Sequence, residues 1–155
     1  MTFRVEQVSR SDTLPLRQRV LRPHQRLDDV GLPGDDRPES GHYAAFDERG
    51  EIVGTGSVIR EAPSWSPDVY PAWRLRGMAT ADGLRRHGIG RAVLAACIAH
   101  VADHGGGLLW CNARLGAVDF YCHAGFVPHG EPWDEISIGP HVAMSRPVPA
   151  SRPGR

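Results

Sequence analysis

The chain has 155 residues, of which 41% are hydrophobic, and its formal net charge at pH 7 is zero. This length and composition indicate one globular domain, while the charge balance argues against nucleic acid as a partner and no apolar run approaches the roughly 18 residues of a membrane span. All 18 basic residues are arginines, which excludes lysine as a Schiff base, a general base or a phosphate ligand.

The N-terminal part of the chain predicts a strand, a helix and a long loop. Residues 2–8 alternate as a strand, and no signal-peptide core precedes them, so a cytoplasmic protein is expected. Ser11-Asp12 could cap a helix that ends near Leu21, with Pro15 tolerated in its first turn. Residues 22–41 are polar and rich in proline and glycine, which predicts a long loop, and such loops in compact domains are often functional.

The rest of the chain predicts an alternation of strands and helices. The expected elements are strands at 42–46 and 51–60 around a turn at 47–50, a central strand at 72–80, a helix at 92–104, a strand at 108–111, a short helix near 117–124, and final strands near 126–132 and 136–147. The domain is expected to span residues 1–148. Residues 149–155 carry no packing signal and are expected to form a disordered tail.

The segment between the central strand and the next helix has the composition of a phosphate-binding turn. Gly88 and Gly90 let the backbone approach an anion, and the free N–H groups at the start of the helix point toward it. A dinucleotide-binding fingerprint would need a third glycine where Val93 stands, and a nucleoside triphosphate loop would need a lysine and a hydroxyl after the second glycine. The turn therefore predicts a pyrophosphate site built from backbone amides.

Three stretches of the chain resemble the GCN5-related N-acetyltransferase (GNAT) superfamily, in its small bacterial single-domain form. The first resembles the family's motif A, an arginine followed by two spaced glycines, here Arg85, Gly88 and Gly90. The second, residues 117–126, resembles motif B, with Phe-Tyr ahead of a Gly-Phe turn. The third, residues 139–144, resembles the closing strand of one bacterial subgroup.

The resemblance covers roughly residues 40–147 and implies a single-domain α+β fold. In that fold a mixed, mostly antiparallel central sheet has helices on both faces, and a splayed strand pair forms the acyl-CoA cleft. The implied activity is transfer of an acetyl group from acetyl-CoA, the cosubstrate, to a primary amine of a small molecule or peptide by direct attack. An acyl-CoA-binding module or sensor that has lost its chemistry is the alternative.

By the same resemblance, the acyl-CoA contacts fall on the strand end, the glycine turn, the next strand and the short helix. The expected cofactor-binding residues are Met78, Ala79, Thr80, Arg85, Arg86, His87, Gly88, Ile89, Gly90, Arg91, Asn112 and Tyr121. The Asn112 amide could bind the pantetheine arm or cap the strand end. A main-chain N–H at Met78 or Ala79 is the expected polariser of the thioester carbonyl.

The resemblance also implies the catalytic residues. Tyr121 occupies the position of the family's general acid, although a tyrosine that only packs the short helix against the sheet is the alternative. Some family members place a glutamate four residues before the Met78 position, and here Arg74, which cannot accept a proton, stands there. The candidate general bases that remain are Glu61, Asp134, Glu135 and His141. His141 is preferred because imidazole titrates near neutral pH, with a purely structural histidine as the alternative.

The acceptor side is predicted from charge and aromatic content. Acidic residues in the two flanking loops predict a cationic amine, or serve only to keep the loops soluble: Asp28, Asp29, Asp35, Asp36, Glu131, Asp134 and Glu135. Aromatic residues could line an acceptor pocket or brace proline-rich loops: Trp65, Tyr70, Trp73 and Trp133.

No metal site is expected, because the histidines and cysteines lack ligand spacing. Each cysteine, Cys97, Cys111 and Cys122, is expected to be a small buried residue. A homodimer is left open.

Overall fold

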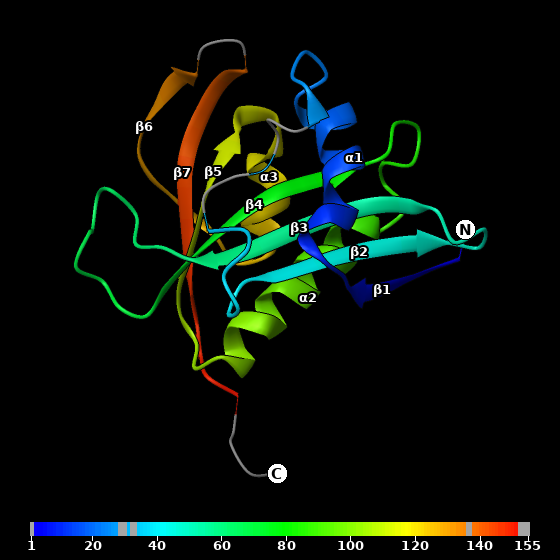
Figure 1. The fold of residues 1–155 in the computed structure, drawn as a ribbon. Helices are drawn as coiled ribbons and strands as arrows, with labels where there is room; N and C mark the ends of the chain where they lie inside the picture. The colour runs from blue at the N-terminus through cyan, green and yellow to red at the C-terminus, as the bar shows by residue number, and fades with distance from the viewer. Residues whose placement is uncertain (1, 28–30, 32–33, 136–137, 152–155) are drawn as a thin grey trace.

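The structure is a computed structural model that describes residues 2–27, 31, 34–135 and 138–151. The strands are β1 (Phe3–Gln7), β2 (Gly41–Asp47), β3 (Ile52–Arg60), β4 (Ala72–Thr80), β5 (Gly107–Arg114), β6 (Val127–Glu135) and β7 (Gly139–Val148). The helices are α1 (Arg10–Leu21), α2 (Ile89–Asp103) and α3 (Val118–His123), and a short 3-10 turn (Leu115–Ala117) leads into α3. Figure 1 shows a single twisted sheet with α1 in front of it and α2 and α3 behind it.

The strands of the described chain form one seven-stranded sheet in the order β1-β2-β3-β4-β5-β7-β6. All neighbouring pairs are antiparallel except β4 and β5, which are parallel. The predicted central strand, β4, is the middle strand of this sheet. A mixed, mostly antiparallel sheet with helices on both faces confirms the predicted α+β architecture.

Helix α2 packs closely on the middle of the sheet because β3 carries glycines beneath it. A Cβ atom added at Gly54 would lie 2.5 Å from Cγ2 of Ile89, and one at Gly56 would lie 2.5 Å from Sδ of Met78. Real Cβ atoms do not approach so closely, so any larger side chain in β3 would push α2 away from the sheet. The two glycines therefore fix the height of the α2 N-terminus above the end of β4.

The predicted hairpin turn between β2 and β3 is confirmed. The Asp47 side chain accepts hydrogen bonds from the backbone N–H groups of Arg49 and Glu51, both at 2.9 Å. Gly50 has φ of 80°, a left-handed conformation that glycine adopts without strain. The aspartate and the glycine together satisfy the turn that the sequence predicted at these positions.

Helix α1 begins earlier than the sequence predicted. Ser9, and not Ser11-Asp12, is the N-cap residue, and the Asp12 N–H already donates to the Ser9 carbonyl at 3.1 Å. With the helix starting at Arg10, Pro15 lies in the second turn and not the first. Proline there removes one backbone donor, which costs stability, so the helix depends on its contacts with the sheet.

A buried ion-pair network attaches α1 and the loop after it to the sheet. The Asp35 carboxylate is buried and accepts hydrogen bonds from Arg17 Nη1 at 3.0 Å and Arg76 Nη2 at 2.9 Å. Arg17 Nη2 donates to Ser57 Oγ at 3.0 Å. His42 accepts a hydrogen bond from Ser57 Oγ at Nδ1 and donates from Nε2 to the Asp35 carbonyl, both at 2.7 Å. Burial lowers the pKa of His42, which favours the neutral ring that this pattern needs.

The C-terminal segment packs further than the sequence predicted. Ser151, in the stretch expected to be disordered, donates a backbone hydrogen bond to the Ala102 carbonyl at 2.9 Å and a hydroxyl hydrogen bond to Asp103 at 2.7 Å. Gly106 has room only for a hydrogen, because a Cβ atom there would lie 2.4 Å from the Val148 carbonyl oxygen. Residues 152–155 lie outside the described part of the chain.

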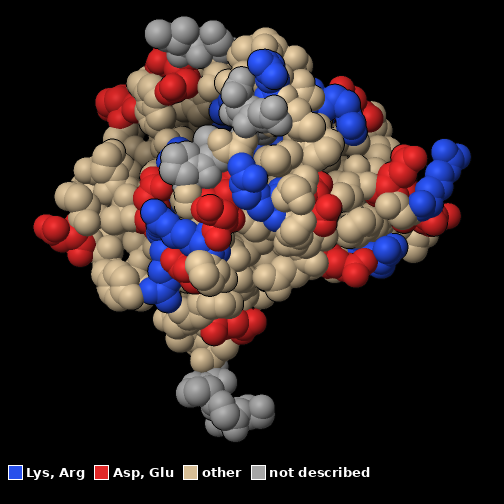
Figure 2. Space-filling model, in the orientation of Figure 1, with Lys and Arg blue, Asp and Glu red and all other residues tan. Residues whose placement is uncertain are grey.

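The surface carries both signs of charge. Figure 2 shows arginine and acidic side chains interspersed over one face, in keeping with the zero net charge of the sequence. In the described chain no helix has the length and apolarity that crossing a membrane requires.

Replacing Asp35 by Asn should lower the free energy of unfolding by about 3–5 kcal/mol, because the change removes the anion that the buried Arg17 and Arg76 guanidinium groups share. Urea denaturation measures this loss. Asp36→Asn is the matched control: Asp36 is the next residue and is exposed, so its substitution should change stability by less than about 0.5 kcal/mol. Equal stabilities of the two variants would contradict the proposed importance of the network.

Candidate functional site

Strands β4 and β5 run side by side only over their first residues. Residues 72–74 of β4 pair in parallel with residues 108–110 of β5, and no later residues of the two strands pair in the described chain. Figure 1 shows the two strands separating beyond that point, while β5 stays paired with β7 from Gly107 to Arg114. From Leu75 onward β4 therefore has one edge without a strand partner, and backbone groups at such an edge can bind an extended ligand.

A first cavity, here called the turn cavity, lies where β4 leads through the glycine turn into α2. Gly88 has φ of 83° and precedes the helix directly. The first N–H groups of α2 have no acceptor within the helix and carry the positive end of its dipole. Most of the predicted cofactor-binding residues line this cavity: Met78, Ala79, Thr80, Arg85, Arg86, Gly88, Ile89, Gly90, Arg91 and Tyr121. Of the other two, His87 does not line it and Asn112 lines the second cavity.

The second cavity, here called the arginine cavity, lies on the other side of the β4–β5 gap. It is bounded by the end of α1, β4, β5 and the β6–β7 hairpin, and its volume is about 430 Å³. Five arginines line it: Arg17, Arg22, Arg74, Arg76 and Arg114. The turn cavity and the arginine cavity share Met78, Arg114 and Tyr121 in their walls, so they meet at the gap.

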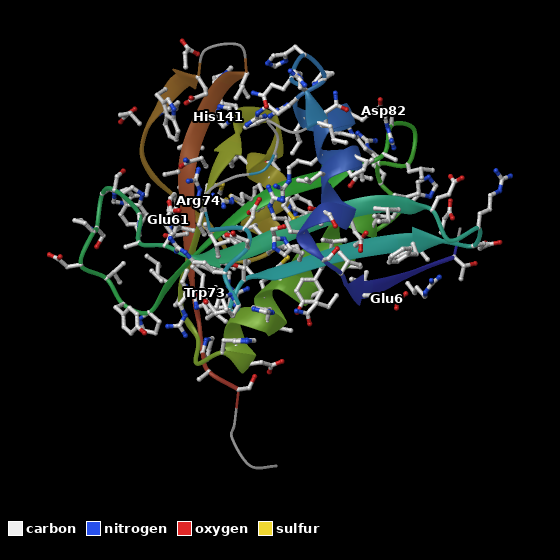
Figure 3. All side chains as sticks on the ribbon, viewed as in Figure 1. Glu6, Glu61, Trp73, Arg74, Asp82 and His141 are labelled. Carbon is white, nitrogen blue, oxygen red and sulfur yellow. The ribbon has the colours of Figure 1, made fainter. Side chains whose placement is uncertain are left out.

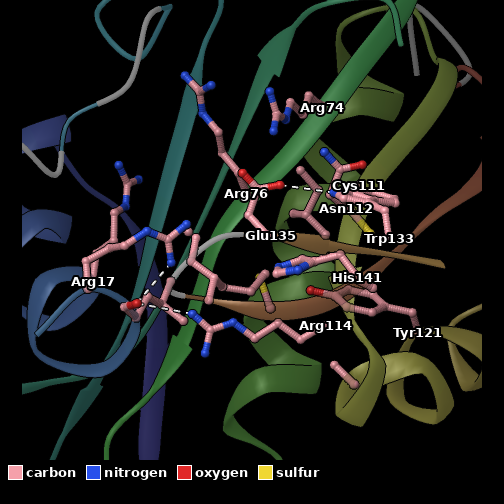
Figure 4. Close-up of a pocket in the computed structure, with 18 of the residues that line it drawn as sticks. Arg17, Arg74, Arg76, Cys111, Asn112, Arg114, Tyr121, Trp133, Glu135 and His141 are labelled. Carbon is pink, nitrogen blue, oxygen red and sulfur yellow. Dashed lines mark hydrogen bonds between the residues drawn. The ribbon is translucent and has the colours of Figure 1, made fainter. Parts of the chain in front are cut away.

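Tyr121 lies at this meeting point. Helix α3 carries it, and its ring packs edge-on against Phe120 and Phe126 at centroid distances of 5.1 and 5.4 Å. Its hydroxyl forms no hydrogen bond with another described residue and points into the cavity beside His141 in Figure 4. Burial raises the pKa of the Tyr121 phenol above its usual range, so the group keeps its proton and can donate it.

His141 faces the same space from β7. Its Nδ1–H donates to the Gly139 carbonyl at 2.8 Å, which leaves a lone pair on Nε2. The indole ring of Trp133 stacks on the imidazole with a centroid distance of 6.0 Å and an angle of 29°. The backbone contact fixes the tautomer and the stacking fixes the ring plane, so Nε2 is available as a proton acceptor.

Arg74 occupies the wall of the arginine cavity at the position where the resemblance led us to look for a glutamate. It donates to Glu61 Oε2 at 3.1 Å, and its guanidinium lies 5.0 Å from the centroid of the Trp110 ring. Glu61 does not line the cavity, and Figure 3 shows it beside Arg74 and apart from His141. The ion pair makes Glu61 a poor candidate for the general base.

The two acidic candidates on β6 differ in position. Asp134 is exposed and does not line the cavity. Glu135 does line it and accepts a hydrogen bond from Trp133 Nε1 at 3.0 Å. Of the four candidate bases, His141 and Glu135 are thus the two that the structure brings to the cavity.

A cysteine also borders the arginine cavity. Cys111 is buried on β5, and burial raises the pKa of its thiol to about 12. A thiol with this pKa remains protonated near neutral pH and is a poor nucleophile. The expectation of a small buried residue is confirmed for Cys97 and Cys111, whereas Cys122 is exposed.

The described cavity walls are basic, which argues against the predicted acidic mouth. Of the described acidic residues expected there, only Glu135 lines the arginine cavity, and Asp35 is buried among arginines. Asp36, Glu131 and Asp134 are exposed outside the cavity, while Asp28 and Asp29 lie outside the described residues.

Only one of the predicted aromatic lining residues is at the cavity. Trp133 lines it, whereas Trp73 is fully buried in the core. The Trp65 ring stacks on His129. Tyr70 is exposed, and its hydroxyl accepts a hydrogen bond from Arg60.

The convergence of the five arginines on one cavity was not predicted from the sequence. Arg74 and Arg76 alternate on the central strand, where charged residues are rare unless they are paired or bind a ligand. That alternation was the available signal. Nothing local to Arg17, Arg22 or Arg114 indicated that α1 and β5 would bring them to the same cavity. The part of the chain that the structure describes holds no cluster of His, Cys, Asp or Glu that could bind a metal.

Comparison with known proteins gives a consistent result. The acetyltransferase (GNAT) family matches residues 7–126. YitI from Bacillus subtilis (strain 168), an uncharacterized N-acetyltransferase, is 34% identical over 154 residues, which cover 96% of this chain and 98% of YitI. A putative N-acetyltransferase from Lactobacillus plantarum superposes with a TM-score of 0.72 at 21% identity, covering 96% of this chain and 99% of that chain.

A further solved structure carries the same fold with a ligand. The phosphinothricin acetyltransferase of Sinorhizobium meliloti, in complex with AcCoA, superposes with a TM-score of 0.75 at 14% identity, covering 100% of this chain and 93% of that chain. The family match includes the glycine turn and all of α3. The structural neighbours share the single-domain α+β fold predicted above. The chain belongs to the acetyltransferase (GNAT) family.

Proposed function

We propose that this protein transfers the acetyl group of acetyl-CoA to a primary amine by direct attack, with Tyr121 as the acid and His141 as the base. The observation that carries the proposal is the meeting of the turn cavity and the arginine cavity at the β4–β5 gap, with Tyr121 in both walls. Direct transfer needs two substrates to reach one point from separate sites. Acetyl-CoA is a cytoplasmic metabolite, which fits the location expected from the N-terminal sequence.

The turn cavity is the proposed site for acetyl-CoA. Backbone amides of residues 86–91 would hold the pyrophosphate, and the free edge of β4 at Met78, Ala79 and Thr80 would bind the pantetheine arm as an added strand. Two proteins of the same fold support this: the phosphinothricin acetyltransferase solved with AcCoA, and an aminoglycoside 6'-N-acetyltransferase complexed with coenzyme A. In this arrangement His87 contributes only through its backbone. Asn112 lines the arginine cavity and not the turn cavity.

The proposed reaction uses the described side chains as follows. The amine nitrogen bonds to the acetyl carbon while the bond from that carbon to sulfur breaks. Nε2 of His141 takes a proton from the amine, and the hydroxyl of Tyr121 gives its proton to the leaving sulfur. A backbone N–H at Met78 or Ala79 polarises the carbonyl. The raised pKa of Tyr121 means that its hydroxyl carries a proton near neutral pH.

The chemistry of Cys111 favours direct attack over a covalent acetyl-enzyme. Cys111 is the cysteine in the arginine cavity wall, and its thiol has a pKa of about 12 because it is buried. The catalytically silent alternative rests on Arg74, which replaces a carboxylate base, but His141 offers a base at the same cavity. Release of CoA thiol from acetyl-CoA across a panel of primary amines separates the two, because a sensor would bind acetyl-CoA and release none.

Arg91→Glu tests the phosphate site. Acetyl-CoA at about 100 times its dissociation constant should stabilise the wild-type fold by roughly 2.7 kcal/mol, seen as a thermal shift. In the variant the affinity should fall about tenfold, because a negative side chain faces the pyrophosphate. The free variant should be at least as stable as the wild type, because α2 has no acidic residue in its first turn and a glutamate there suits the helix dipole.

The matched control for this charge reversal is Arg49→Glu, on the exposed β2–β3 turn away from both cavities. It should leave the acetyl-CoA shift unchanged. The phosphate site would lie elsewhere if Arg91→Glu and Arg49→Glu bound acetyl-CoA equally well.

Tyr121→Phe tests the acid. The variant keeps the ring that packs against Phe126 and loses one hydroxyl, so its stability and acetyl-CoA affinity should change little. Turnover should fall about 10²–10⁴-fold, the usual contribution of a positioned acid. Pre-steady-state measurement must establish that chemistry limits the rate. Unchanged turnover under that condition would leave Tyr121 with a packing role only.

Comparison of His141→Gln with Glu135→Gln identifies the base, because both residues line the arginine cavity. Loss of His141 should lower kcat/KM about 10²–10⁴-fold. Loss of Glu135 should lower kcat/KM much less. The reverse pattern would assign the base to Glu135.

A further inference from the structure

The arginine cavity has an unbalanced charge. Among the described residues its walls contain five guanidinium groups and one carboxylate, that of Glu135, although the chain as a whole has equal numbers of basic and acidic residues. Arginine side chains without an acidic partner normally lie at the surface in contact with water. It is therefore unusual that five arginines line one cavity beside the proposed reaction site.

Three of the five arginines have acidic partners. Arg17 and Arg76 share the Asp35 carboxylate at 3.0 and 2.9 Å, and Arg74 pairs with Glu61 at 3.1 Å. These three residues therefore have structural roles that need no ligand.

Arg22 and Arg114 are the two that lack an acidic partner among the described residues. Both donate to one backbone oxygen, that of Leu21 at the end of α1, from Arg22 Nη1 at 2.9 Å and from Arg114 Nη2 at 3.1 Å. A carbonyl dipole accepts two hydrogen bonds but does not neutralise two charges, so the cations repel each other.

The electrostatic environment of Arg22 reflects this crowding. Burial lowers its pKa most, and the charge of Arg114 lowers it further. Glu135 opposes this with a smaller effect, and Arg17 lowers the pKa least. An anion bound between Arg22 and Arg114 would remove the repulsion. A guanidinium fork matches the paired oxygens of a carboxylate or a phosphate group.

The position of these arginines relates them to the reaction. Arg114 on β5 is the direct cross-strand partner of His141 on β7, so both side chains project from the same face of the sheet. Arg22 lines only the arginine cavity and not the turn cavity, which argues against a role in binding the CoA phosphates. An anionic group held here would lie next to the proposed base.

We infer that the amine acceptor carries an anionic group, a carboxylate or a phosphate ester, which Arg22 and Arg114 bind while His141 activates the amine. This inference rests on the proposed function and names its substrate class. It replaces the cationic acceptor that the loop acids predicted. The adjacency of Arg114 and His141 favours a short acceptor, with few bonds between the amine and the anion.

The test compares probes that differ only in the anion. Each protein amino acid and β-alanine is paired with its carboxamide, and O-phosphoethanolamine is paired with ethanolamine. Binding to the protein saturated with CoA is measured by thermal shift and calorimetry, and acetylation is measured by thiol release from acetyl-CoA. At least one anionic probe should bind about tenfold or more tightly than its neutral partner, and rising salt should weaken it. The amino acid and phosphate arms distinguish the two sources of the anion.

Variants assign the effect to residues. Arg22→Gln and Arg114→Gln should each raise KM for the anionic acceptor about tenfold or more. Arg22 does not line the turn cavity, so Arg22→Gln should leave KM for acetyl-CoA unchanged. Arg19→Gln is the control, because Arg19 is exposed on the same helix outside the cavity. Arg22→Lys keeps the positive charge. If this variant still prefers the anionic probe, Arg22 binds the anion and does not have a structural role alone.

Three results would overturn the inference. They are equal or tighter binding of the neutral or cationic probes, no binding of any anionic probe, and a rise in the acetyl-CoA KM alone in Arg22→Gln or Arg114→Gln. The binding arm keeps this test separate from the proposed function. If no amine were acetylated, the enzyme assignment would be contradicted. The comparison of anionic and neutral probes in the binding measurement would still test whether the site prefers an anion.

Discussion

The divergence of β4 from β5 is the constraint on which the rest of the structure depends. Hydrogen bonding between these parallel strands stops after residues 72–74 and 108–110, while β5 stays paired with β7 on its other edge from Gly107 to Arg114. The second half of β4 is then an open edge in the middle of the sheet, where a sheet normally has none. The turn cavity forms on one side of that edge and the arginine cavity on the other.

Two further features hold the divergence in shape. The glycines of β3 let α2 lie close to the sheet, which sets the phosphate-binding turn beside the end of β4. On the opposite face, Asp35 joins Arg17 of α1 to Arg76 of β4 and so fixes the helix whose C-terminus bounds the arginine cavity. Buried ion pairs contribute little net stability compared with apolar packing. In this protein the buried ion pairs hold α1 and the loop after it in one position over the cavity.

The sequence predicted what depends on local pattern and missed what depends on long-range packing. The glycine turn, the hairpin at Asp47 and the central position of β4 follow from residue types at fixed spacing, and the structure contains all three. The burial of Asp35 does not follow from local spacing. Its arginine partners are distant in the sequence, and without them a loop rich in acidic residues is expected to be exposed to solvent. The same holds for Arg22 and Arg114, which meet only because α1 ends beside β5.

Amide hydrogen exchange with and without acetyl-CoA tests most directly whether the open edge of β4 is the cofactor site. Backbone N–H groups that form no strand pair exchange readily, and a pantetheine arm bound along the edge would protect them. The account predicts slower exchange in residues 75–80 and 86–91 on addition of acetyl-CoA, with little change in β1 and β2. Unchanged exchange in β4 and the turn, with acetyl-CoA demonstrably bound, would contradict it.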